Sequence, residues 1–145
     1  MENVKDLAKT ETLKDTVKAF YTDCLTVNSH TDVPAVMGKL LADDFQSISA
    51  KEIKVKAVFI GQIQFFWKLI PDLKWVPQEI LQDGNKIIVR SLFSGSPKGE
   101  FMGMTLDGSK SFSSMSIDIH TVENGQIKTV YHIEDWPTAI AQLKG

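Results

Sequence analysis

The hydrophobic period of the chain changes once, at Pro71, and this change constrains the fold more than any other feature. Before Pro71 the apolar residues recur every three or four positions, as they do on amphipathic helices. From Leu73 onward many of them alternate with polar residues, as on strands with one covered face. Helices followed by an antiparallel sheet predict an α+β domain in which the helices cover one face of the sheet.

Three helices are predicted in the first half of the chain. The apolar stripe of the first helix consists of Leu13, Val17, Phe20, Cys24 and Val27. Thr10 or Thr12 is available as its N-cap, and Asp32 can cap a second, shorter helix with Pro34 in its first turn. A short extended connection follows. The third helix begins near Lys51 and ends where the next proline stops it, because proline lacks an amide proton and restricts the residue before it.

The second half of the chain predicts strands, a loop and a terminal helix. The predicted strands are residues 73–82, 86–95, 111–122 and 126–136. The glycine-rich stretch 95–110 is interpreted as a broad crossover loop, and residues 137–144 as a short helix. With 145 residues, 43% of them hydrophobic, and no repeat or linker, the chain is expected to form one domain over residues 1–145.

Composition narrows the range of partners. The 16 basic and 18 acidic residues give a net charge of -2, and the lysines are scattered, so no nucleic-acid partner is expected. Cys24 is the only cysteine, which excludes an internal disulfide and fits a reducing, cytoplasmic location. Three histidines at unrelated spacings do not indicate a metal site. The N-terminus lacks a secretory signal, and the most apolar window, 57–70, is too short and too interrupted to span a membrane.

The last predicted strand ends on a carboxylate, Asp135. The apolar residues of the last two strands have odd numbers, Met115, Ile117 and Ile119 on one and Ile127, Tyr131 and Ile133 on the other. Odd residues oppose odd residues if a three-residue loop, 123–125, joins the strands with Gly125 in the left-handed conformation. This register predicts that Asp135 faces the helices on the apolar side. Asp118 and His120 are then expected on the outer face, in a surface or dimer-interface role.

Two interpretations of Asp135 remain open at this point. Asp is a favoured N-cap, and Pro137 follows at the start of the predicted terminal helix, so the carboxylate has a structural explanation. Alternatively, burial on an apolar face raises its pKa and makes it a proton carrier near neutral pH. Arg90, within an apolar strand, is expected to point outward with its stem packed, although it could bind a substrate oxyanion.

An ordered series of short motifs in the C-terminal half resembles the SnoaL-like polyketide cyclases of the nuclear transport factor 2-like superfamily. The motifs are Pro71-Asp72-Leu73, Gly95-Ser96-Pro97 with Gly99, Phe101 and Gly103, Asp118-Ile119-His120, Asn124-Gly125-Gln126-Ile127, and Tyr131 through Asp135. The chain departs from the family pattern at Ser96-Pro97, where the family has Thr-His, and at Tyr131, where it has Trp.

The resemblance implies a cone-shaped, curved antiparallel sheet wrapped around three N-terminal helices, with homodimers formed across the outer face. The aspartate matched by Asp135 serves in the cyclases as the acid and base of an intramolecular aldol ring closure that uses no cofactor or metal. The predicted ligand is a small hydrophobic molecule. Its predicted pocket is lined by Tyr131, Trp67, Phe59, Ile63, Met115 and Met102. The alternative is a non-catalytic ligand-binding or dimerisation module in which Asp135 only caps a helix.

Overall fold

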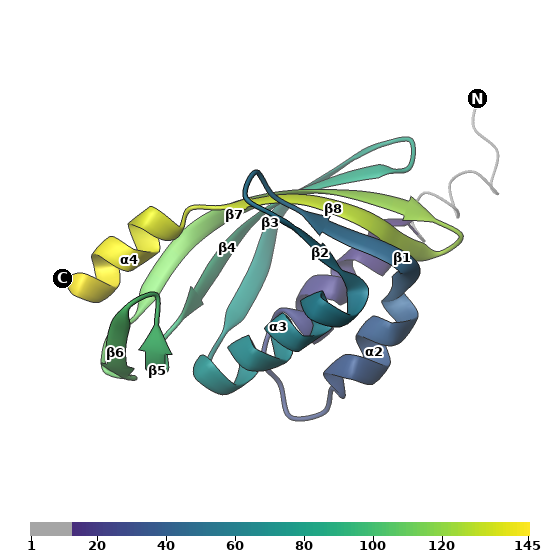
Figure 1. Ribbon diagram of the computed structural model, residues 1–145. Coiled ribbons are helices and arrows are strands. Elements are labelled where there is room, and N and C mark those ends of the chain that lie inside the picture. The colour runs from purple at the N-terminus through teal and green to yellow at the C-terminus, as the bar shows by residue number, and fades with distance from the viewer. Residues whose placement is uncertain (1–12) are drawn as a thin grey trace.

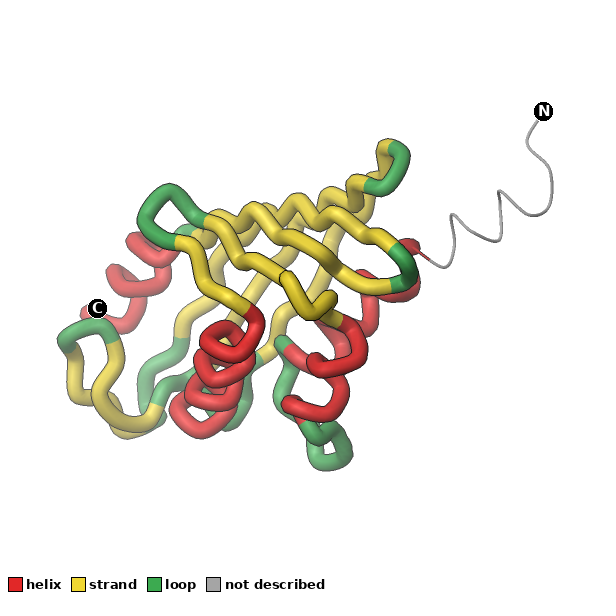
Figure 2. Tube along the Cα trace, turned by 45° about the vertical axis from the view of Figure 1, so that its right-hand side comes forward, coloured by secondary structure: helices red, strands yellow, loops and turns green. Residues whose placement is uncertain are grey.

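The structure is a computed structural model and describes residues 13–145. Its centre is a six-stranded sheet that curves over the helices. The strand order is β2-β1-β8-β7-β4-β3, and a separate hairpin, β5-β6, lies beside the C-terminal helix (Figure 1). Figure 2 shows that the helices of the N-terminal half lie on one side of the sheet and leave its other face uncovered. The predicted α+β class, with a curved sheet around N-terminal helices, is confirmed.

The elements follow one another along the chain with short connections. The helices are η1 (Phe20–Cys24), α2 (Val33–Leu40), α3 (Lys56–Leu69) and α4 (Trp136–Lys144). The strands are β1 (Leu41–Ile48), β2 (Ile53–Val55), β3 (Lys74–Asp83), β4 (Lys86–Gly95), β5 (Lys98–Phe101), β6 (Met104–Asp107), β7 (Phe112–Glu123) and β8 (Gln126–Glu134). Within residues 13–145, no helix has the length and hydrophobicity needed to cross a bilayer.

The first helix has its predicted apolar stripe, and the second has its predicted cap. Residues 13–19 are α-helical and continue into the π-helical turn η1, which buries Phe20, Tyr21 and Cys24. Asp32 caps α2 by accepting a hydrogen bond from the backbone N–H of Ala35 at 3.2 Å, as predicted. Thr10 and Thr12, the predicted caps of the first helix, lie outside the described residues.

Three segments of the chain form strands that the sequence did not predict. The extended connection after α2 is the strand β1, which pairs in parallel with β8, and its buried Phe45 and Ser47 alternate with exposed Gln46. Residues near Lys51 do not start a helix, because the chain first forms β2 antiparallel to β1. The predicted crossover loop contains the hairpin β5-β6, whose turn at residues 102–103 has positive φ at both positions.

The hairpin of β7 and β8 has the predicted pairing but a different loop. Its turn contains only Asn124 and Gly125, both with positive φ (53° and 74°), which suits a two-residue hairpin turn. An extra residue in β8 opposite Thr121 and Val122 forms a bulge and restores odd-to-odd pairing further along the strands. The three-residue loop was therefore the wrong explanation for a correct register.

The predicted facing of this hairpin is wrong. The even-numbered residues of β7, including Asp118 and His120, are buried toward the helices, whereas the odd-numbered Met115, Ile117 and Ile119 are 40–43% exposed on the outer face. Parity fixes which residues share a face but not which face is covered. The covered face of β7 is the more polar one, because this chain encloses a partly polar pocket between the sheet and the helices.

Candidate functional site

A pocket of about 470 Å³ lies between the concave face of the sheet and the helices. Its apolar wall consists mainly of Phe20, Phe59, Ile63, Phe66, Trp75 and Trp136. Its polar wall contains Ser47, Lys54, Asp118, His132 and Glu134. Apolar walls with a few convergent polar groups are typical of sites that bind and orient small molecules.

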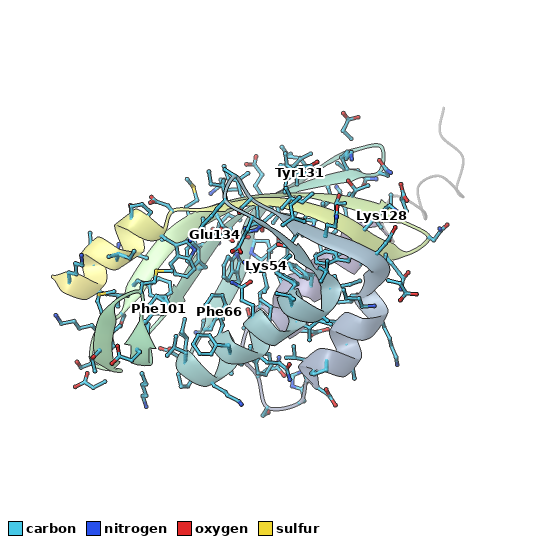
Figure 3. The ribbon with its side chains drawn as sticks, in the orientation of Figure 1. Lys54, Phe66, Phe101, Lys128, Tyr131 and Glu134 are labelled. Atoms are coloured by element: carbon cyan, nitrogen blue, oxygen red, sulfur yellow. The ribbon has the colours of Figure 1, made fainter. Side chains whose placement is uncertain are left out.

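The sheet itself places the polar groups together. Asp118 on β7 is the ladder partner of His132 on β8, and Ser116 is the partner of Glu134 two residues further along the same two strands. Directly paired residues project to the same face, so all four point toward the helices. Figure 3 shows Glu134 on the helix side of the sheet and Tyr131 on the opposite side.

Asp118 is the buried carboxyl group of the pocket. Asp118 is only 3% exposed, and its carboxylate accepts a hydrogen bond from the hydroxyl of Tyr21 at 2.6 Å. Burial raises the pKa of Asp118 to about 7, although the hydrogen bond from Tyr21 acts in the opposite direction. A carboxyl group with a pKa close to neutrality can both accept and donate a proton under physiological conditions.

Behind Asp118 lie two further buried polar groups. The Tyr21 hydroxyl also contacts Nε2 of His120 at 2.7 Å, and neither residue is exposed. Burial lowers the pKa of His120 to about 3, so its imidazole is neutral at neutral pH. Burial and the nearby carboxylate of Asp118 raise the pKa of Tyr21 well above its usual value, which keeps the phenol protonated.

His132 and Glu134 form a second pair on the pocket wall. Nδ1 of His132 lies 2.8 Å and 3.0 Å from the two carboxylate oxygens of Glu134, and both side chains are largely buried. The hydrogen bond to Glu134 raises the pKa of His132. Because Glu134 takes Nδ1, the other ring nitrogen, Nε2, is left without a partner among residues 13–145.

Two charged residues, Glu52 just before β2 and Lys54 within it, also line the pocket at its rim. Lys54, whose side chain is 15% exposed, donates a hydrogen bond to Glu52 at 2.7 Å. Figure 3 shows Lys54 and Phe66 on the same side of the sheet as Glu134. The lining of the pocket therefore combines paired charged side chains with aromatic rings.

The predicted pocket residues are distributed over both faces of the sheet and the core. Phe59, Ile63 and Met102 line the pocket. Trp67 does not; it packs against the core and donates its indole N–H to the carbonyl oxygen of Cys24 at 2.8 Å. Tyr131 and Met115 lie on the outer face, 53% and 43% exposed, so the prediction that they face the pocket is wrong.

Asp135 is exposed and caps α4. Its carboxylate accepts hydrogen bonds from the backbone N–H of Thr138 at 3.1 Å and from the Thr138 hydroxyl at 2.7 Å. These hydrogen bonds lower the pKa of Asp135. The prediction that Asp135 faces an apolar interior is wrong, because β8 ends at Glu134 and the next residue starts the helix.

The buried polar groups were partly visible in the sequence. Polar residues occupy every second position from Ser114 to His120, which places them on one face of a strand. They are Ser114, Ser116, Asp118 and His120. Hydrophobicity alone, however, predicts that this face is the outer one. Tyr21 and Glu134 gave no local signal, because a single polar group on an apolar helix and a charged strand end are common surface patterns.

The N-cap role of Asp135 predicts a pH-dependent contribution to stability. Asp135→Ala is expected to lower the Tm modestly at neutral pH, because the variant loses both hydrogen bonds to Thr138. The folded-state pKa is depressed, so the contribution is present above the usual aspartate pKa and disappears as the pH falls through the folded-state value. Thermal unfolding of both proteins across acidic pH should therefore show converging Tm values; a constant difference would contradict the cap role.

Comparison with known proteins gives one family and one fold. The sequence profile of the SnoaL-like polyketide cyclases matches residues 15–143. No curated protein sequence matches significantly. Among solved structures, IdmH from Streptomyces antibioticus, a proposed polyketide cyclase, is 23% identical with a TM-score of 0.78, over 92% of this chain and 99% of its own.

Two other structures agree with this fold. A proposed SnoaL-like polyketide cyclase from Jannaschia sp. CCS1 has a TM-score of 0.81 at 16% identity, over 93% of each chain. A hypothetical protein from Catenulispora acidiphila with a ketosteroid isomerase-like fold, solved with trimethylamine, has a TM-score of 0.72 at 13% identity, over 90% of this chain and 92% of its own.

Proposed function

The chain belongs to the SnoaL-like polyketide cyclase family, and on this premise we propose that it binds a small hydrophobic carbonyl compound and catalyses its acid–base conversion with Asp118 as proton carrier. The observation that supports this function best is the placement of Asp118: its carboxyl group lines a pocket that also has an apolar wall, and its pKa is raised to about 7. This role replaces the one expected of Asp135.

An aldol ring closure needs only proton transfers and one carbon–carbon bond. The Asp118 carboxylate takes a proton from a carbon next to a carbonyl group, which leaves an enolate. The enolate carbon then attacks a second carbonyl carbon of the same molecule, and the electron pair of that C=O bond moves to its oxygen. The resulting alkoxide takes a proton from His132 or from Asp118, and protons passed between these residues and water restore the starting state. No oxidant or reductant is consumed.

His132 is suited to the acid role in this sequence. Glu134 holds Nδ1 and favours the protonated imidazolium, so Nε2–H is available as a donor beside Asp118. An oxyanion that develops next to this donor is stabilised by the hydrogen bond and by the positive charge of the imidazolium. Asp118 and His132 lie on paired positions of β7 and β8. One side chain can therefore act as the base and the other as the acid, as enolate chemistry requires.

The experiment that tests this function measures proton abstraction without knowledge of the natural substrate. α-Tetralone, a bicyclic aromatic ketone, is incubated with the protein in D₂O, and loss of the signal from the protons beside the carbonyl is followed by proton NMR. The wild type is expected to exceed the buffer rate. Binding is followed separately through the fluorescence of the two pocket tryptophans, Trp75 and Trp136. Binding without exchange would favour the non-catalytic ligand-binding module.

The outer face of the sheet is the proposed surface for a homodimer. Its large apolar side chains are 40–70% exposed, namely Val76, Leu81, Leu92, Met115, Ile117, Ile119, Tyr131 and Ile133. The ladder pairings place Ile117 between Arg90 and Ile133, near the middle of this surface. An apolar sheet face of this extent is typical of an interaction site.

Ile117→Lys is expected to convert the dimer to a monomer at micromolar concentration, because the lysine would place an unpaired charge in the centre of the buried surface. Val58→Lys is the matched control, since Val58 is equally apolar and 56% exposed but lies on α3. Sedimentation velocity distinguishes the two states. A monomeric wild type, or equal effects of the two substitutions, would exclude this dimer.

We also propose a cytoplasmic location for the protein. Its single cysteine, Cys24, is a buried free thiol, and burial raises its pKa to about 12. A buried, protonated thiol is compatible with a reducing compartment. Fractionation of the source cells would test the location directly.

A further inference from the structure

We propose that Tyr21 and His120 are positioning residues that hold one oxygen of Asp118, Oδ2, and so leave Oδ1 as the oxygen that exchanges a proton with the bound compound. The inference rests on the proposed function of Asp118. It concerns a chain of three buried side chains that connects the pocket wall to the helical layer.

The three side chains come from two elements, η1 and β7, whose side chains meet in the core. Tyr21 projects from the π-helical turn η1, and its hydroxyl oxygen lies 2.6 Å from Oδ2 of Asp118 and 2.7 Å from Nε2 of His120. Asp118 and His120 are two residues apart on β7, so both point toward the helices. One phenol therefore bridges two side chains of the same strand.

The number of protons determines the direction of the hydrogen bonds. Tyr21 has one hydroxyl proton, and neutral His120 has one ring N–H. If Tyr21 donates to the carboxylate, His120 must donate through Nε2–H to the phenol oxygen, and both short contacts are satisfied. Nδ1 of His120, which has no partner among the described residues, is then a bare acceptor. If Tyr21 instead donated its proton to Nε2 of His120, the carboxylate of Asp118 would have no donor. The ring N–H of His120 would then be on Nδ1, buried and without an acceptor among residues 13–145.

The remaining oxygen of Asp118 is available to a ligand. Asp118 lines the pocket, and within residues 13–145 the only hydrogen bond to its carboxyl group is the one that Tyr21 donates to Oδ2. The other titratable or charged groups that face it are His120 on its own strand, His132 and Glu134 on β8, and Lys54 at the rim. None of these donates a hydrogen bond to Oδ1.

The arrangement also affects how readily Asp118 gives up its proton. Burial favours the protonated carboxyl, whereas the donor from Tyr21 favours the carboxylate. His120 strengthens this donor, because a phenol that accepts a hydrogen bond is a better donor itself. Removing either residue should therefore raise the pKa of Asp118, with the larger change for Tyr21, which makes the direct contact.

The test is a carboxyl titration by NMR in protein labelled with ¹³C-aspartate, with Asp118→Asn used to assign the signal. Tyr21→Phe is expected to move the titration midpoint of Asp118 upward from the wild-type value. Tyr131→Phe, the matched substitution on the outer face, is expected to leave the midpoint unchanged. An unchanged or lowered midpoint in Tyr21→Phe would overturn the proposal.

His120 is tested by two substitutions and by its own tautomer. His120→Leu should raise the midpoint by less than Tyr21→Phe does, and His120→Gln, which retains an N–H donor, should restore it. The ¹⁵N shifts of the wild-type imidazole need no substitution and should show a proton on Nε2 and none on Nδ1 at neutral pH. A proton on Nδ1, or an imidazolium, would overturn the proposal. These measurements require no substrate, so they can fail independently of the proton-exchange assay.

Discussion

Asp118→Asn is expected to reduce the rate of protein-catalysed deuterium exchange into α-tetralone by a factor of about 10² to 10⁴, the usual contribution of a general base. The amide has nearly the shape of the carboxyl group and can still accept a hydrogen bond from Tyr21, but it cannot take a proton from carbon. Binding measured by tryptophan fluorescence should change little. This combination would identify Asp118 as the group that moves the proton.

Two controls separate this effect from loss of structure. Asp135→Asn is the matched substitution at an exposed aspartate and should exchange at the wild-type rate. The second control is the pH dependence of stability. The pKa of Asp118 is raised in the folded state, from 3.8 to about 7, so the wild type loses stability as the pH rises through that range. Asp118→Asn should therefore gain stability relative to the wild type over this interval. A wild-type exchange rate in this variant would exclude the proposed function.

Phe93→Ala is expected to lower the free energy of unfolding by about 3–5 kcal/mol, the usual cost of removing a buried phenylalanine ring. Phe93 is completely buried, and its ring centroid lies 4.5 Å from that of Trp75, 5.0 Å from that of Trp136 and 5.6 Å from that of Phe112. This cluster joins three strands of the sheet, β3, β4 and β7, to α4. Its loss should also shift the fluorescence of the two tryptophans.

Phe65→Ala is the control for this substitution. Phe65 has the same side chain but is 55% exposed on α3, so its removal should cost less than 1 kcal/mol, about the range for surface sites. Urea denaturation of the three proteins gives the comparison. Equal losses for Phe93→Ala and Phe65→Ala would show that the aromatic cluster does not hold α4 on the sheet.

The amino-acid sequence alone predicted the order of the helices and of the strands β3, β4, β7 and β8, together with several local details. The change of period at Pro71, the cap at Asp32 and the end of α3 before proline all depend on residues close together in the chain. Such local effects of hydrogen bonding and backbone restriction do not depend on the rest of the fold. The odd-to-odd pairing of β7 and β8 was also predictable, because strand residues alternate strictly.

Only the tertiary structure decided which face of that hairpin is covered. The odd-numbered residues are the more apolar, yet they lie outward, and the serines with Asp118 and His120 lie beneath the helices. Tyr21, distant in sequence, forms hydrogen bonds with both Asp118 and His120 across the interior. A polar group can be buried when a partner is available, and the position of that partner depends on how the helices pack on the sheet. Periodicity therefore determined which residues share a face, and long-range packing determined which face became the pocket.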